Sequence, residues 1–261
     1  MALDLQQWSI IAPALLAGLL VLATHVPLGM EVLARGIIFI DLAIAQVAGL
    51  GVIGAGAAGL EPHGVGVHVA AVSAALAAAV ALMWSERRWP EVQEAVIGVL
   101  FVIAATAGIL LLAKNPHAGE HLKDLLVGQI LWVNYSQLIP VALLTAVIAG
   151  LWLGLGPRLG RLGFYVVFAL AVTLSVQLVG VYLVFASLIV PALATRHFAR
   201  HRLTAGYALG AAGYGLGLIV SAALDLPSGA VIVWTMTLIG VGCYALAASR
   251  VLESFNRERN P

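Results

Sequence analysis

The stretch from Arg35 to Gly51 reads RGIIFIDLAIAQVAGLG and holds one carboxylate, Asp41, in an otherwise apolar run. Burying an unpaired carboxylate in hydrocarbon is costly, so ionisable residues inside such runs usually face the protein interior and belong to a binding site or pathway. Two interpretations are open for Asp41. It can offer an oxygen ligand to a cation, or it can accept hydrogen bonds from a neighbouring helix and fix the packing.

The sequence HAGEH, residues 117–121, is a second candidate site. It lies in the longest polar interruption of the chain, residues 114–137. On a helix, His117 and His121 would lie on one face because they are four residues apart, and Glu120 stands between them in the sequence. This arrangement suits a metal ion. Pro116 and Gly119 disfavour a regular helix, so a solvated loop remains the other interpretation.

The chain lacks the motifs of common enzymes. It contains no GxSxG nucleophile elbow, no GxxxxGK[ST] phosphate loop and no HExxH zinc motif. The formal net charge of +1 disfavours nucleic-acid binding, and the single cysteine excludes a disulfide framework. We therefore expect a protein that is not itself an enzyme.

The composition indicates which kind of secondary structure carries these candidate residues. The chain is 62% hydrophobic and 10% charged, whereas a soluble domain is about 25% charged. Its 28 glycines and its alanine runs favour closely packed membrane helices, and its continuous apolar runs disfavour a β-barrel. We predict an all-α, polytopic transmembrane helical bundle in which residues 1–261 form a single domain.

A membrane span needs about 20 apolar residues. Eight apolar runs have about this length or are longer. They are residues 8–29, 36–59, 65–84, 92–113, 138–155, 163–195, 203–222 and 228–248. The first run has no basic segment before it and no clear cleavage site, so we expect it to be retained as a span rather than removed as a signal peptide.

The run 163–195 is too long for one straight crossing. Arginines cluster after the first and third runs, at 156–163, at 196–202 and in the tail, and the positive-inside rule places all five clusters in the cytoplasm. An even number of crossings must then separate Arg161 from Arg196. We predict a helical hairpin or a broken helix that turns near Gly180, which gives eight or nine crossings in total.

Several segments, in this order, make the chain similar to the membrane permeases of bacterial ATP-binding-cassette importers for zinc and manganese. These segments are PLGMEVLARGIIFIDLAIAQVAGLG (27–51), EAVIGVLFVIAATAGILLL (94–112), DLLVGQIL (124–131), VGVYLVFASLIVPALATR (179–196) and LDLPSGAVIV (224–233). Together they extend across nearly the whole chain.

The resemblance implies one half of a homodimeric permease in the inner (plasma) membrane. Separate cytoplasmic ATPase subunits would drive it, and a periplasmic or lipid-anchored metal-binding protein would deliver the ion. The ion, Zn²⁺ first and Mn²⁺ second, would be the transported substrate, and no permanently bound cofactor is implied. The segment that follows the VPALATR-type run would contact the ATPase. In this chain the residues concerned are Pro191, Arg196, His197, Arg200 and Arg202.

The resemblance fails at one position of the metal site. The family typically has an aspartate followed four residues later by a histidine, as in GDALSHA, and both side chains line the path of the ion. Here Asp41 is present, but the fourth position is Ala45 and the next polar residue is Gln46. Gln46 lies about 140° from Asp41 around a helix. Either Gln46 replaces the histidine, or an imidazole such as His25 comes from elsewhere.

Two other assignments are weighed against metal import. One is a permease of the iron–siderophore or cobalamin type, which needs a wide cavity rather than a coordinating carboxylate. The other is a membrane scaffold or enzyme that transports nothing.

Overall fold

The computed structural model of the chain describes residues 5–61, 64–112, 126–155, 158–198 and 200–259, and these ranges are helical with no strand. The main α-helices are α1 (Leu5–Arg35), α2 (Ile40–Ala57), α3 (Val65–Arg88), α4 (Gln93–Leu112), α6 (Tyr135–Leu155), α7 (Gly160–Val179), α8 (Val181–Ala194), α9 (Arg202–Leu224) and α10 (Ser228–Arg259). Two short 3₁₀ helices, η1 (Pro90–Val92) and η2 (Ile130–Trp132), precede α4 and α6.

The count of spans agrees with the sequence. Within the described ranges, eight helices are long and apolar enough to cross a membrane, and α8, with 14 residues, is a shorter apolar helix. The predicted interruption of residues 163–195 lies at Gly180, which separates α7 from α8 and has φ +80°. The all-α, polytopic bundle with eight or nine crossings is therefore confirmed.

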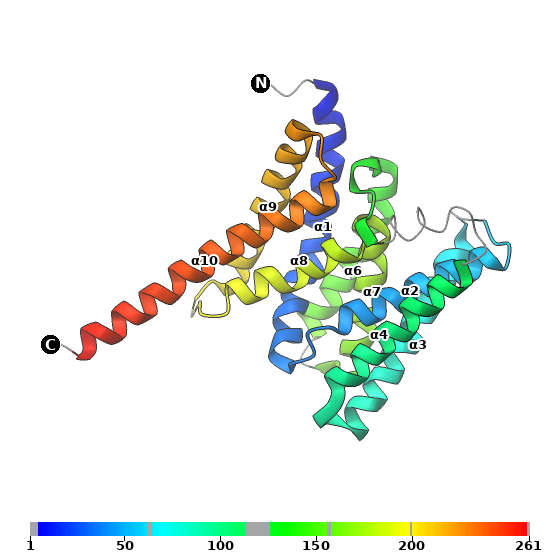
Figure 1. Ribbon diagram of the computed structural model, residues 1–261, viewed down its shortest axis with the longest axis horizontal. Helices are drawn as coiled ribbons and strands as arrows, with labels where there is room; N and C mark the ends of the chain where they lie inside the picture. The colour runs from blue at the N-terminus through cyan, green and yellow to red at the C-terminus, as the bar shows by residue number, and fades with distance from the viewer. Residues whose placement is uncertain (1–4, 62–63, 113–125, 156–157, 199, 260–261) are drawn as a thin grey trace.

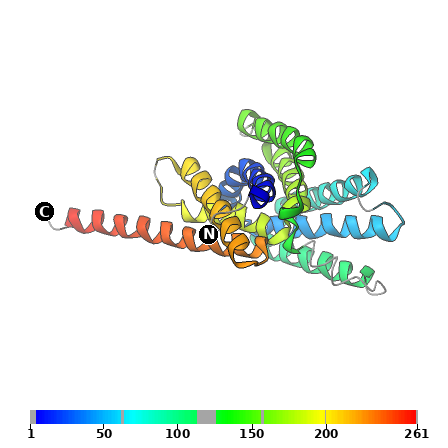
Figure 2. The same cartoon turned by 90° about the horizontal axis from the view of Figure 1, so that it is seen from above.

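The helices form three neighbouring groups (Figures 1 and 2). Helices α2, α3 and α4 lie together on one flank, and α2 packs extensively on both of the others. Helices α9 and α10 pack together on the opposite flank, and the C-terminal part of α10 runs out beyond the rest of the bundle. Helix α1 packs on α6, α7, α8 and α9, and α7 packs on α2 and α3, so α1 and α7 together connect the groups.

Small residues allow α1 to approach α8 and α9 closely. A Cβ atom on Gly29 of α1 would collide with the carbonyl of Leu188 in α8. A Cβ atom on Gly206 of α9 would lie 2.8 Å from Cγ1 of Val26. Lipid tails are as apolar as the helices, so close backbone packing of this kind is what holds a membrane bundle together.

A proline inside α1 leaves one backbone carbonyl without its usual hydrogen bond, and a side chain of a neighbouring helix pairs with this carbonyl. Pro27 has no N–H group to donate to the carbonyl of Ala23, four residues earlier. The hydroxyl of Tyr207, on α9, donates a hydrogen bond to this carbonyl over 3.1 Å. Because hydrocarbon offers no water to an unpaired carbonyl, this contact lets α1 continue as one helix of 31 residues.

The turn at Gly180 is covered by the segment that enters the bundle before η2. Gly128, which also has a positive φ of +72°, lies against the backbone of Val179 and Gly180. A Cβ atom on Gly229, at the start of α10, would lie 2.6 Å from the carbonyl oxygen of Val127. The Val127–Gly128 backbone is thus held between the α7–α8 turn and the first turn of α10.

This close approach predicts that a methyl group at position 180 is more damaging than one at an open turn. Gly36, in the α1–α2 connection, has φ +70°, and a Cβ atom added there would meet nothing within 4 Å, so Gly36→Ala costs only the backbone strain of about 1–2 kcal/mol. We expect Gly180→Ala to lower the free energy of unfolding by about 1–3 kcal/mol more, because the methyl group overlaps Val127 and Gly128 and because φ +80°, ψ 165° is a conformation that essentially only glycine adopts. Thermal unfolding of both variants in the same detergent measures the difference. Equal losses of stability would show that the approach of the two backbones is not tight.

Candidate metal pathway

Asp41 lies in the first turn of α2 and is 1% exposed. Neither carboxylate oxygen accepts a hydrogen bond from the residues that the structure describes. The residue before the helix, Phe39, has no polar side chain to cap the N-terminus and instead stacks on Phe185 of α8, with 6.3 Å between the ring centroids. The free N–H groups of a helix N-terminus favour negative charge, and the backbone N–H groups of Asp41 and Leu42 act in this way here, although burial opposes the charged form more strongly.

This environment is unusual for a carboxylate with a purely structural role. A buried polar group that only fixes packing normally has its hydrogen bonds made. Gln93 illustrates the usual case, because its amide accepts a hydrogen bond from Ser85 and donates one to the carbonyl of Leu82. Asp41 has both oxygens available instead, which is the chemistry of a site that takes up a cation or a proton.

The connection that leads into α2 is fixed on both sides. The backbone N–H of Ile38 donates to Oε1 of Glu94 over 2.5 Å, which joins this connection to the start of α4. The guanidinium of Arg35 pairs with Glu31 at 2.7 Å and lies over the ring of Phe164, 4.1 Å from its centroid. These contacts from α4, α1 and α7 hold the first turn of α2, and therefore Asp41, in place.

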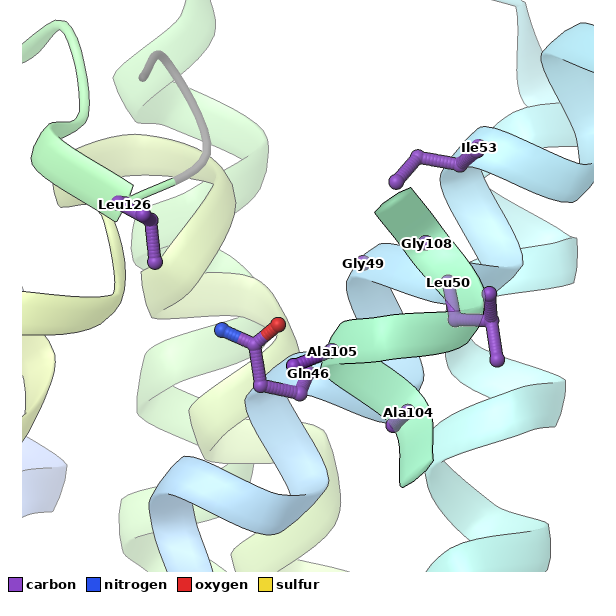
Figure 3. Close-up of a pocket in the computed structure, with 8 residues that line it drawn as sticks. All are labelled: Gln46, Gly49, Leu50, Ile53, Ala104, Ala105, Gly108 and Leu126. Atoms are coloured by element: carbon purple, nitrogen blue, oxygen red, sulfur yellow. The ribbon is translucent and has the colours of Figure 1, made fainter. Parts of the chain in front are cut away.

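Gln46 belongs to a different environment from Asp41. It is half-buried and lines a cavity of about 20 Å³ between α2 and α4, and its amide extends toward the segment that contains Leu126 (Figure 3). The other lining residues are Gly49, Leu50, Ile53, Ala104, Ala105 and Gly108. Such a space holds about one water molecule. Asp41 does not line it, so the structure does not bring the two side chains together.

The remaining sequence candidates fall into two classes. His117, Glu120 and His121 lie outside the described residues. His25 is fully buried in α1, where its Nδ1 atom lies 3.0 Å from the carbonyl oxygen of Val21, and it does not line the cavity beside Gln46. The described ranges contain no group of three or more histidine, cysteine, aspartate or glutamate side chains arranged to hold a metal ion.

The segment expected to meet the ATPase is well organised. Pro191 is buried within α8, and Arg202 donates to the carbonyl of Ala192 near the end of that helix over 3.2 Å. Arg196, His197 and Arg200 are exposed. The guanidinium of Arg196 donates to the hydroxyl of Tyr244 over 2.8 Å, which connects this surface to α10. Nothing in the sequence marks Tyr244, which lies 48 residues from its partner.

A second polar contact between distant residues also carries no sequence signal. His68, in the first turn of α3, lies beside Gln177 of α7, and Nδ1 of the imidazole is 2.6 Å from Oε1 of the amide. Both side chains are exposed.

Comparison with known proteins identifies the family. The model of the ABC 3 transport family matches residues 7–154 and 151–247. The chain belongs to this family. It is a multi-pass membrane permease of an ATP-binding-cassette transporter, and its resemblance to metal-importer permeases is confirmed.

Two curated relatives and one solved structure resemble this permease. It is 26% identical over 212 residues to the "High-affinity zinc uptake system membrane protein ZnuB" of Haemophilus influenzae, with 74% of this chain and 79% of that protein covered. It is 27% identical over 201 residues to a "Probable iron transport system membrane protein" of the same organism, with 68% and 69% covered. The structure of PsaBC from Streptococcus pneumoniae in complex with Fab superposes with a TM-score of 0.75 at 20% identity, over 92% of each chain, and shows the same fold.

The unpaired state of Asp41 predicts that this permease gains stability when the carboxylate is removed. Asp41→Leu replaces two buried, unpartnered oxygens with a hydrocarbon of similar size, so we expect the free energy of unfolding to rise by about 1–3 kcal/mol. Gln93→Leu is the matched control, because it breaks two hydrogen bonds of a buried side chain and should lower stability by a similar amount. Thermal unfolding in detergent compares the two. A loss of stability in Asp41→Leu would mean that the carboxylate fixes the helix packing.

Proposed function

We propose that the chain is the permease half of an importer that moves a divalent transition metal across the inner membrane, with Asp41 as an oxygen ligand in its path. The observation that carries this proposal is the buried carboxylate in α2, whose two oxygens have no protein partner among the described residues. A cation in transit supplies the missing partner. A site that lets the ion leave again must bind it weakly, and one carboxylate with few further ligands fits this requirement.

The partners follow from the family and from the absence of a phosphate-binding motif in the chain. We propose that residues 1–261 form one permease domain, that two copies assemble, and that separate ATPase subunits drive them. The exposed side chains of Arg196, His197 and Arg200, with Pro191 and Arg202 supporting them, would form the ATPase contact. A metal-binding protein on the outer side would deliver the ion.

Zinc is our first choice of substrate, because one relative is named as a zinc uptake membrane protein, and manganese is the second. Zinc sites favour nitrogen and sulfur ligands, whereas carboxylate and amide oxygens suit harder ions such as Mn²⁺. The absence of a histidine four residues after Asp41 is the reason that manganese is retained as a candidate. Iron is a further candidate, because one relative is named as a probable iron transport protein. In the pathway, Gln46 would meet the ion through water, and His117, Glu120 and His121 would receive it at the outer mouth.

Uptake of metal by the reconstituted complex tests the function. We expect ATP-dependent uptake of radioactive zinc or manganese into proteoliposomes, and we expect Asp41→Asn to reduce it at least tenfold, because an amide is a much weaker ligand than a carboxylate. Asp225→Asn is the control, since this exposed aspartate after α9 adopts a left-handed conformation that asparagine also tolerates. Uptake by Asp41→Asn equal to that of the wild type would refute the role of Asp41. Uptake of siderophores or cobalamin, with no uptake of free metal ions, would refute metal import.

Charge reversal tests the ATPase contact separately. We expect Arg200→Glu to reduce both copurification of the ATPase subunits and metal-stimulated ATP hydrolysis several-fold, because it places an acid on the proposed docking surface. Arg158→Glu reverses another exposed charge, in the α6–α7 connection. This variant should leave copurification of the ATPase subunits and metal-stimulated ATP hydrolysis near the wild-type level. Equal losses in the two variants would indicate a general effect of charge on the cytoplasmic side.

A further inference from the structure

The contact between His68 and Gln177 orients the imidazole. Oε1 of Gln177 can only accept a hydrogen bond, so Nδ1 of His68, 2.6 Å away, donates to it. In the neutral form of such a ring the lone pair lies on Nε2. No hydrogen bond among the described residues engages Nε2, and the side chain is exposed.

This is the arrangement that metal-binding histidines normally adopt. The ring nitrogen that does not bind the metal donates its N–H to a carboxylate or carbonyl oxygen, which fixes the tautomer and makes the other nitrogen a better ligand. An exposed hydrogen bond between two neutral side chains adds little to stability, because water competes for both groups. The pair is therefore better suited to orienting an imidazole than to holding α3 against α7.

The position of the pair along both helices places it at the outer ends of the spans. His68 lies 20 residues before Arg88, or about 30 Å along α3, and Gln177 lies 17 residues after Gly160, or about 26 Å along α7. The hydrocarbon core is about 30 Å thick. Because the arginines mark the inner ends of these helices, both side chains lie near the outer boundary, whereas Asp41 begins α2 at the inner side.

We propose that Nε2 of His68, oriented by Gln177, is a ligand that receives the divalent transition metal at the outer end of α3 and α7, before the ion reaches Asp41. This proposal rests on the proposed function and deepens it. It supplies an imidazole to a chain that has alanine where the family has histidine. One imidazole with water as the remaining ligands binds a metal weakly and releases it readily.

Metal binding to the full-length permease in lipid nanodiscs tests the site directly. Zn²⁺ is titrated in competition with a fluorescent chelator, and zinc X-ray absorption reports whether imidazole is bound. We expect His68→Ala to weaken the binding at least fivefold and to reduce the imidazole signal by the contribution of one ring. Val69→Ala, at the adjacent exposed position, should leave both unchanged. Unaltered affinity and an unaltered imidazole signal in His68→Ala would overturn the proposal.

Substitutions of Gln177 separate a ligand role from a structural one, because they retain the imidazole. Gln177→Glu keeps the acceptor oxygen and adds charge, which makes Nε2 more basic, so we expect Zn²⁺ to bind several-fold more tightly. Gln177→Leu removes the acceptor and should weaken the binding several-fold. If both variants bind zinc as the wild type does, Gln177 does not orient the ring and the proposal fails in this respect.

Transport distinguishes failure of this proposal from failure of the proposed function. In proteoliposomes containing the whole complex, we expect His68→Ala to raise the apparent KM for the metal at least fivefold with a maximal rate within twofold of the wild type. Metal uptake by the wild type with an unchanged KM in His68→Ala would overturn only the role of His68. No metal uptake by the wild type would overturn the proposed function itself, whatever the Zn²⁺ titration shows.

Discussion

Hydrocarbon contains no water that could pair with a free backbone group, and this constraint explains the surroundings of Pro27 in α1 and of the break at Gly180. Pro27 frees the carbonyl of Ala23, and the Tyr207 hydroxyl of α9 pairs with it. The break at Gly180 lies under the Val127–Gly128 backbone rather than against lipid. In α8, the Ser187 hydroxyl donates to the carbonyl of Leu183 and also contacts the Tyr214 hydroxyl at 2.9 Å. The irregular helices are therefore possible only because their neighbours supply particular polar or small residues.

Because an unpaired polar group is costly in hydrocarbon, a buried side chain that has no hydrogen-bond partner is informative about function. Gln93 and Asp41 are both almost completely buried, yet the amide of Gln93 is hydrogen-bonded and the carboxylate of Asp41 is not. Every other contact around the first turn of α2, from the Phe39–Phe185 stack to the Ile38–Glu94 hydrogen bond, holds the carboxylate in place without neutralising it. The proposed role of Asp41 as a transient metal ligand rests on this unpaired carboxylate.

The sequence was sufficient for the helical class, the number of spans and the turn at Gly180, because hydropathy, the spacing of arginines and glycine are local signals. It also indicated that Asp41 and Gln46 lie on different faces of one helix, since this depends only on helical geometry. It could not indicate that Gln46 lines a small cavity beside α4, or that His68 meets Gln177 across 109 positions. Those contacts depend on how the helices pack, and no local pattern encodes the packing. The assignment of His117, Glu120 and His121 falls outside the described residues and stays a prediction.

Helix α10 has a mechanical consequence for the whole subunit. Its first turn lies against Val127, which in turn covers the α7–α8 break, and Tyr244 further along the same helix holds Arg196 at the opposite end of α8. With 32 residues, the helix is about 48 Å long and exceeds the thickness of the hydrocarbon core. A helix that contacts both ends of a neighbouring helix couples them, because a tilt about its contact with Val127 moves Tyr244 and the guanidinium that Tyr244 binds. Helix α10 thus connects the α7–α8 turn to the surface that contains Arg196.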